Sequence, residues 1–402
     1  MSDFLLSVDQ LKCLRNDYAH NNCSICVDLC PERAINTDRR KLKIDESACT
    51  LCHGCIGVCP TEAIESQKFE PNFYIAKEIA FENNEIKQKL IGESLKMSCK
   101  DLGACLAVFD ESHIISLALK SQRKIELDLS GCELCDLNKN GKLKTCIDMF
   151  ILESINFLSE FAPKKVPSVI AVKKDERRNF FKTIFKRSAN IAEEINEGEI
   201  ERPKTKIPLK RILLKNAIKD AIEEENRFVA GNYGFAVTKE ITKDCSNCKS
   251  CVEFCPTNAL FYSNDYSKIY FQSGKCTDCS ICNDICAPKA FVDGFEKDMS
   301  VFAFDKAKTA IELDMRPCRS CNMAFASKNG EDICPICDGY EKNFSDMFLT
   351  AEELEAALKE IITETGATSG KDMGKVMGVA SKKLAGLAEG RAISAKVKEL
   401  LG

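Results

Sequence analysis

The sequence predicts an α+β protein assembled from several small modules, and three observations support this. The 402 residues include 25 cysteines, most of them in two dense blocks at 23–59 and 245–286, which form an internal repeat. Short segments with strand character accompany these blocks. Two cysteine-poor regions, 163–244 and 349–402, instead have charged, helix-like patterns. The expected module boundaries are 1–70, 71–162, 163–234, 235–300, 301–345 and 349–402.

Composition excludes several classes of protein. An odd number of cysteines cannot all pair as disulfides, and 25 is far more than packing requires, so most of the thiols are expected to bind something. No apolar run reaches the roughly 18 residues needed to cross a bilayer, and residues 1–10 carry Asp3 and Asp9 without a signal-peptide pattern. The formal charge of -4 gives no general attraction for nucleic acid. We therefore expect a soluble protein.

The block at 245–286 consists of two C-x2-C-x2-C-x3-C halves, with Pro256 following the first. Three thiolates two residues apart wrap one cluster in a tight loop, and the fourth ligates the neighbouring cluster. A zinc site would need only two C-x2-C pairs, so this spacing argues against zinc. Short strands are expected at 235–238 and 268–271. The eight candidate ligands are Cys245, Cys248, Cys251, Cys255, Cys276, Cys279, Cys282 and Cys286.

These eight cysteines and Pro256 resemble the bacterial two-cluster ferredoxin family. The resemblance implies two 4Fe-4S clusters in this block and a crossed arrangement of ligands. One cluster would be held by Cys245, Cys248, Cys251 and Cys286, and the other by Cys276, Cys279, Cys282 and Cys255. The second half departs from the family pattern because Ala287 stands before Pro288, which leaves the turn after Cys286 undefined.

The N-terminal block has the same form with one gap, since the position three residues before Cys23 is His20. Either the His20 imidazole completes the first cluster, or Cys13 does so across a nine-residue loop, or the corner stays open with solvent or a three-iron cluster. We prefer Cys13 because thiolate is the usual ligand; His20 is then a solvated loop residue. The candidate ligands are Cys13, Cys23, Cys26 and Cys59, and Cys30, Cys49, Cys52 and Cys55.

Two further cysteine pairs lie near the C-terminus. Cys318 and Cys321 form one C-x2-C pair, and Cys334 and Cys337 form the other, twelve residues later. This is the pattern of a zinc ribbon, in which a closed tetrahedron holds a small fold together. Iron would use the same geometry. We favour zinc because the longer spacing typical of rubredoxin is missing.

The middle region 71–162 is expected to be a small α/β domain. An apolar run at 114–119 and an alternating run at 125–129 have strand character, and the second ends beside a cysteine pair. Two interpretations remain open, namely a fifth iron-sulfur cluster or a set of buried free thiols. The candidate ligands are Cys99, Cys105, Cys132 and Cys135. Cys146 is then the one cysteine that is assigned to no site.

The region 163–234 is expected to be a helical linker, with amphipathic helices at 181–195 and 214–222 joined by a polar stretch at 197–208. A further helix is expected from Ala351, with Thr350 as its cap. The segment 366–377, with Gly390 and Arg391, resembles the tail domain of the GatB/YqeY family, and the resemblance implies an association with tRNA. No stacking aromatic lies there, so we favour a solvated helical appendage over RNA binding.

Together these patterns predict an iron-sulfur electron carrier with four 4Fe-4S clusters. No G-x-G-x-x-G motif and no nucleophile-base pair is recognisable, which argues against an enzyme. The resemblance to polyferredoxins implies redox partners such as a formate dehydrogenase or a hydrogenase. Abundant thiolates place the protein in a reducing, low-oxygen cytoplasm. The alternatives are an oxidoreductase subunit with substrate chemistry in the middle region, and a redox-sensing protein that contacts tRNA through its tail.

Overall fold

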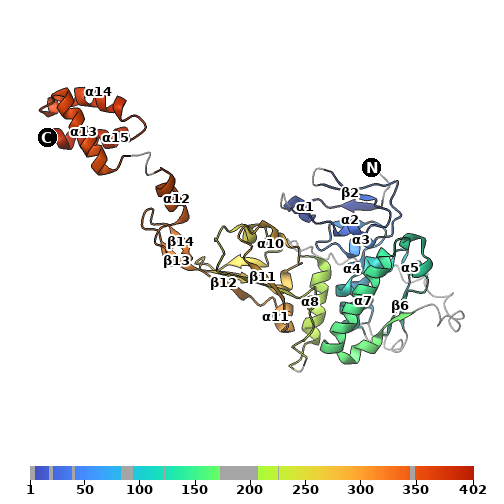
Figure 1. The fold of residues 1–402 in the computed structure, drawn as a ribbon. Coiled ribbons are helices and arrows are strands. Elements are labelled where there is room, and N and C mark those ends of the chain that lie inside the picture. The colour runs from blue at the N-terminus through green and yellow to red at the C-terminus, as the bar shows by residue number, and fades with distance from the viewer. Residues whose placement is uncertain are drawn as a thin grey trace. The chain divides into compact units, whose positions relative to one another are not determined.

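The computed structural model describes residues 5–17, 21–38, 41–82, 94–121, 123–172, 207–224, 226–344 and 349–402. The chain divides into two compact units, Met1–Glu312 and Leu313–Gly402. Both units combine helices with short strands, as predicted (Figure 1). Among the described residues, no helix has the length and the apolar character that a membrane span requires.

The N-terminal cysteine block folds around two antiparallel strand pairs, β1 with β4 and β2 with β3. Each three-cysteine loop leads into a short helix, and these helices carry Cys26 and Cys55. The elements are β1 (Leu6–Val8), α1 (Leu14–Asp17), α2 (Ile25–Leu29), β2 (Ile35–Asp38), β3 (Lys41–Ile44), α3 (Gly54–Gly57) and β4 (Ile64–Ser66).

The middle region contains a parallel sheet in the order β5-β6-β7, with long helices as crossovers. The strand expected at 125–129 is confirmed as β6, but the strand expected at 114–119 is wrong, because these residues lie in α6. Asp110 and His113 form a capping box at its start, and Ser112–Leu119 are all buried. The elements are α4 (Pro71–Glu82), β5 (Leu95–Met97), α5 (Cys99–Leu102), η2 (Leu106–Val108), α6 (Glu111–Lys120), β6 (Ile125–Asp128), η3 (Cys132–Leu134), η4 (Asp136–Asn138), α7 (Lys142–Phe161), η5 (Pro163–Ser168) and β7 (Val169–Val172).

Helix α8 (Leu209–Ala221) joins the two halves of the first unit. It packs against α6 and against α11 of the second cysteine block, which is labelled beside it in Figure 1. Leu214 and Ile218 are fully buried in the core that the two halves share. The helix predicted at 214–222 is thereby confirmed, although it begins five residues earlier. The helix expected at 181–195 and most of the polar stretch expected at 197–208 lie outside the described residues.

The second cysteine block repeats the architecture of the first. Strand β8 pairs with β11, and β10 lies between β9 and β12. The strand predicted at 268–271 is confirmed as β10. The one predicted at 235–238 begins two residues later, because Phe235 packs into an aromatic cluster instead. The elements are β8 (Val237–Ile241), α9 (Ser250–Glu253), β9 (Leu260–Tyr262), β10 (Lys268–Phe271), η7 (Ser273–Lys275), α10 (Ile281–Ile285), β11 (Phe291–Phe295), α11 (Met299–Ala303) and β12 (Lys308–Glu312).

The second unit begins with a β-hairpin and ends with three helices that share a small core. Thr350 and Glu353 form a capping box at the start of α13, which confirms the predicted cap, and Gly366 ends the helix with a positive φ of 65°. Leu358, Val376 and Val397 are fully buried. The elements are β13 (Asp314–Pro317), β14 (Ala324–Ser327), α12 (Pro335–Phe344), α13 (Ala351–Thr365), η9 (Gly370–Asp372), α14 (Met373–Lys383) and α15 (Gly390–Leu401).

Candidate iron-sulfur and metal sites

The second cysteine block encloses two small cavities, each lined by four of the predicted ligands. In both cavities, three cysteines come from one loop and the fourth comes from the other half of the block. The apolar side chains of Ile241 and Ile269 line the first cavity, and Leu260 and Phe271 line the second. The cysteines lining the first cavity are Cys245, Cys248, Cys251 and Cys286; those lining the second are Cys255, Cys276, Cys279 and Cys282.

The N-terminal block groups its cysteines in the same crossed way. Cys30, Cys49, Cys52 and Cys55 line one cavity. The other four lie near one another: burial, together with the neighbouring thiols of Cys59, Cys23 and Cys13, raises the pKa of Cys26 to about 12.

Cys13 is the fourth thiol that lies near this group. It directly precedes α1 and is 8% exposed. Burial raises its pKa most, and the charges of Cys59 and Cys23 add to this effect. The alternative residue, His20, lies outside the described residues, so the structure offers no comparison between the two.

The middle cysteines also come together. A hydrogen bond with the Cys105 thiol lowers the pKa of Cys99 to about 6. Burial raises the pKa of Cys132 to about 11, with contributions from the nearby thiols of Cys99 and Cys135. The backbone N–H of Cys105 donates to the carbonyl of Cys52 at 3.2 Å, which places this group directly beside the N-terminal block.

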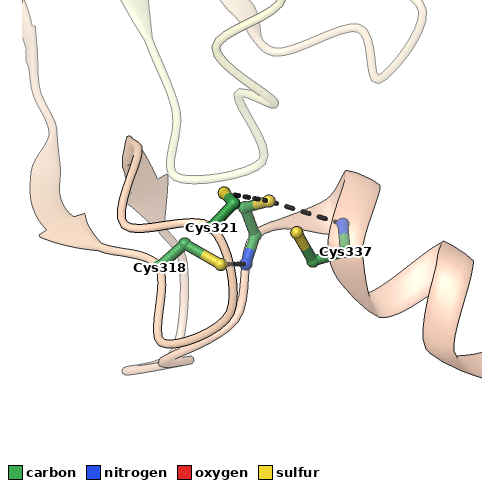
Figure 2. A group of neighbouring side chains, drawn as sticks. Cys318, Cys321 and Cys337 are labelled. Atoms are coloured by element: carbon green, nitrogen blue, oxygen red, sulfur yellow. Dashed lines mark hydrogen bonds between the residues drawn. The ribbon is translucent and has the colours of Figure 1, made fainter. Parts of the chain in front are cut away.

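The two C-terminal pairs form a compact group in the second unit (Figure 2). The sulfur atoms of Cys318, Cys321, Cys334 and Cys337 all lie within 4.8 Å of one another. The N–H of Cys334 donates to Cys318 Sγ at 3.3 Å, and the N–H of Cys337 donates to Cys334 Sγ at 3.4 Å. Backbone hydrogen bonds from Cys321 and Cys334 hold the pKa of Cys318 at about 6, so a metal-binding thiolate is favoured.

Comparison with known proteins gives three family matches and one similar curated protein. A 4Fe-4S dicluster domain matches residues 21–63, a 4Fe-4S binding domain matches residues 239–261, and a Yqey-like protein matches residues 342–401. Subunit ForD of ferredoxin oxidoreductase 1 from Aquifex aeolicus (strain VF5) is 32% identical over 65 residues, which cover 15% of this chain and 82% of ForD. The chain belongs to the 4Fe-4S ferredoxin family. It is thus an iron-sulfur protein suited to electron transfer, and the predicted likeness of its tail to YqeY is confirmed.

The structure shows a recurring hydrogen bond in this ferredoxin that the sequence did not lead us to predict. Each cysteine block consists of two halves, and each half ends in a cysteine. A buried alanine follows this last cysteine four residues later, and its backbone N–H donates to the cysteine Sγ at 3.2–3.3 Å. The residue before each alanine has a φ of 52–53°. The pattern C-x3-A could have revealed these donors. The pairs are Cys30 with Ala34, Cys59 with Ala63, Cys255 with Ala259 and Cys286 with Ala290.

The same observation defines the turn after Cys286. Although its proline is displaced to position 288, Lys289 has a φ of 52° and the N–H of Ala290 reaches Cys286 Sγ at 3.3 Å. The turn thus matches the other three. Because N–H groups aimed at sulfur stabilise the thiolate form, this arrangement fits a cysteine that ligates a cluster.

His53 gives an independent test of whether a cluster fits. Its ring is 1% exposed and lines the cavity of Cys30, Cys49, Cys52 and Cys55. Within the described part of the chain, neither ring nitrogen has a hydrogen-bond partner. Burial lowers the pKa of His53, so the ring is neutral and has one N–H to donate. A buried donor without a partner is costly, and the sulfur atoms of a 4Fe-4S cluster would supply the acceptor.

We expect His53→Leu to lower the reduction potential of the cluster in this cavity, because loss of an N–H donor destabilises the more negative reduced state. Leucine tolerates this backbone, since Leu51 has a φ of 54° close to the 64° of His53. His53→Asn is the control, because asparagine keeps a donor and also adopts positive φ. A redox titration followed by EPR measures the potential. Equal potentials in the two variants, at unchanged iron content, would contradict this role.

Proposed function

We propose that this ferredoxin carries single electrons between oxidoreductases through four 4Fe-4S clusters. The main support is that the predicted ligands gather in crossed sets of four, three of which line cavities in the folded chain. When bound, each cluster accepts and releases one electron. The proposed ligand sets are Cys13, Cys23, Cys26 and Cys59; Cys30, Cys49, Cys52 and Cys55; Cys245, Cys248, Cys251 and Cys286; and Cys255, Cys276, Cys279 and Cys282.

The chain's own residues would bury the clusters and adjust their charge. In the second block, Lys239 is 3% exposed, and its ammonium lies 2.9 Å from a carboxylate oxygen of Asp293 and 3.1 Å from one of Asp278. The thiols of Cys282 and Cys276 lie close enough to raise its pKa. Lys239 also lines the cavity of Cys255, Cys276, Cys279 and Cys282, so its side chain would help to enclose the cluster proposed there.

The middle group Cys99, Cys105, Cys132 and Cys135 is proposed to hold a fifth cluster. Its support is the closeness of the four thiols and the hydrogen bond that joins Cys105 to Cys52. The alternative, a set of buried free thiols, predicts that Cys132→Ser leaves the iron content unchanged, because free thiols hold no iron. A loss of about four irons per chain in Cys132→Ser would support the cluster.

Electron transfer is tested with purified partners of the proposed kind. A formate dehydrogenase supplied with formate, or a hydrogenase supplied with hydrogen, is expected to bleach the visible absorbance of the ferredoxin without oxygen. The same chain stripped of iron serves as the control. Failure of every such enzyme to reduce a fully loaded sample that dithionite does reduce would reject these partners and leave the electron-carrier proposal standing.

For the C-terminal group we propose zinc, because the four sulfurs already lie within tetrahedral reach of one ion. Cys334→Ser is expected to lose about one zinc per chain and to expose the hairpin β13–β14 to protease, with iron content unchanged. Ile336→Ser, at an 84% exposed residue between Cys334 and Cys337, is the control. Elemental analysis and proteolysis measure both effects; iron in place of zinc would reject the proposed metal.

A further inference from the structure

Helix α8 begins between the two cysteine blocks and is tied to the first of them. The carboxylate of Glu62, three residues after Cys59, accepts the backbone N–H groups of Leu209 and Lys210 at 2.7 and 2.9 Å. These are the first two residues of α8. The first N–H groups of a helix have no partner within it, and a negative charge is favourable there. Glu62 therefore fixes the start of α8 beside the segment that follows Cys59.

The Lys210 side chain adds a second contact with the N-terminal block. It is buried, and its Nζ donates to the carbonyl of Gly57 at 2.8 Å. Gly57 lies between the proposed ligands Cys55 and Cys59. The charge of Lys210 is balanced, because a carboxylate oxygen of Asp110 lies 2.8 Å from its ammonium. Lys210 thus holds α8 against the ligand loop of the N-terminal block without adding an unpaired charge.

Arg211, the next residue, reaches the second block instead. It is 6% exposed. Its Nε donates to the carbonyl of Gly274 at 3.1 Å, and its Nη2 donates to the carbonyls of Ser273 and Cys276. The guanidinium also lies over the Phe302 ring, 4.8 Å from the ring centroid. Arg211 is therefore fixed against the loop that begins the second half of this block, in which Cys276 is the first proposed ligand.

The charge of Arg211 is directed at the proposed cluster site and not at a carboxylate. In the described ranges, no carboxylate forms an ion pair with Arg211: Asp305 pairs with Lys215, and burial and neighbouring charges raise the pKa of Glu111 to about 8, so that Glu111 is largely protonated at pH 7. Burial lowers the pKa of Arg211 to about 10, and the Cys276 thiol opposes this shift more than any carboxylate does. A buried charge without an opposite charge is unfavourable, and the thiolates around a bound cluster would supply one.

These contacts bring one ligand of each block to the start of α8. The residues on both sides of Cys59 and the residue after Cys276 line one cavity, together with Lys210 and Arg211. The lining residues from the two cysteine segments are Val58, Pro60 and Thr277. In the other ligand set of the second block Cys248 is exposed, whereas Cys276 is buried. The set of Cys276 thus faces the first block, and the set of Cys248 reaches the surface.

From this arrangement we infer that electrons cross between the two blocks at the start of α8, from the cluster of Cys59 to the cluster of Cys276 or in the reverse direction. In each crossing one cluster loses an electron and the other gains it, so no further reactant is consumed. Arg211 acts on this step through the cluster: its positive charge stabilises the more negative, reduced state of the Cys276 cluster and so raises the reduction potential. The inference rests on the proposed electron-carrier function and adds the pair of clusters that joins the blocks.

Two double variants of the full chain, purified without oxygen, test the crossing. Cys30→Ser with Cys286→Ser keeps the clusters of Cys59 and Cys276, whereas Cys30→Ser with Cys276→Ser keeps those of Cys59 and Cys248. Every other cluster is common to both variants. Magnetic coupling between reduced clusters falls steeply with distance, so EPR after dithionite reduction is expected to show stronger splitting in the first variant. Equal splitting, or stronger splitting in the second variant, overturns the inference. Missing iron in the wild type would instead count against the electron-carrier proposal.

Arg211→Gln, added to the first double variant, tests the role of the charge. Reduction of the Cys276 cluster is expected to become about tenfold less favourable, a fall of about 59 mV for one electron, because the buried cation is lost. Arg211→Lys keeps the charge and is expected to restore the original potential. Arg227, which pairs with Asp298, provides the control Arg227→Gln. A redox titration followed by EPR measures the potentials.

An unchanged potential in Arg211→Gln, or the same shift in all three arginine variants, would reject the role of Arg211. Loss of about four irons in Arg211→Gln, with full iron in Arg211→Lys, would support it, because the cluster would then depend on the charge for its assembly.

Discussion

Purified without oxygen, the full chain is expected to contain at least about sixteen irons, because four clusters hold four irons each. A fifth cluster would raise this to about twenty. The sample is expected to be brown and to give an EPR signal at low temperature after reduction with dithionite. Iron and sulfide analysis measures the number directly. About eight irons or fewer would reject the proposal of two dicluster blocks.

The crossed ligand sets allow a second iron measurement, which tests which cysteines share a cluster. Cys286→Ser is expected to remove about four irons, belonging to the cluster shared with Cys245, Cys248 and Cys251, and to leave the neighbouring cluster in place. Cys146→Ser is the matched control, because Cys146 lies outside every proposed set. An equal loss of iron in both variants, or none in either, would contradict the assignment.

The largest loss of stability is expected from Phe157→Ala. Phe157 is fully buried, stacks on Phe161 at 5.0 Å between ring centroids, and meets Tyr233 and Phe235 edge to face at 5.2 and 5.1 Å. Removing a ring from such a cluster costs about 3–5 kcal/mol. Because Phe157 lies on α7 and Phe235 lies two residues before β8, the variant also weakens the junction between the middle region and the second block.

Thermal unfolding without oxygen, followed by circular dichroism, measures this effect. Leu152→Ala is the control, since Leu152 lies on the same helix but is 60% exposed. We expect a clearly lower midpoint for Phe157→Ala and faster loss of visible absorbance at a fixed temperature. Equal midpoints in the two variants would show that the aromatic cluster does not hold the two halves together.

Local patterns predicted much of the candidate site. A cluster-binding loop is built from residues two or three positions apart, so the spacing from Cys245 to Cys286 and the pairs at Cys318 and Cys334 can be recognised without any tertiary information. The cap at Thr350 and the strand at 268–271 depend on equally short-range chemistry. The C-x3-A pattern is equally local, so the sequence alone also identifies its alanines.

Features that depend on contacts between residues far apart in the sequence could be identified only from the folded structure. Residues 114–119 form a short apolar run, and such a run has the same composition in a buried strand and in a buried helix. The helix forms here because Asp110 caps it and because it packs against α8. Arg211 lies 65 residues from Cys276, whose carbonyl it contacts. Amino-acid order alone therefore determined the loops that hold metal, whereas tertiary packing decided which thiols meet and where a buried cation faces a cavity, because both depend on contacts between residues far apart in the chain.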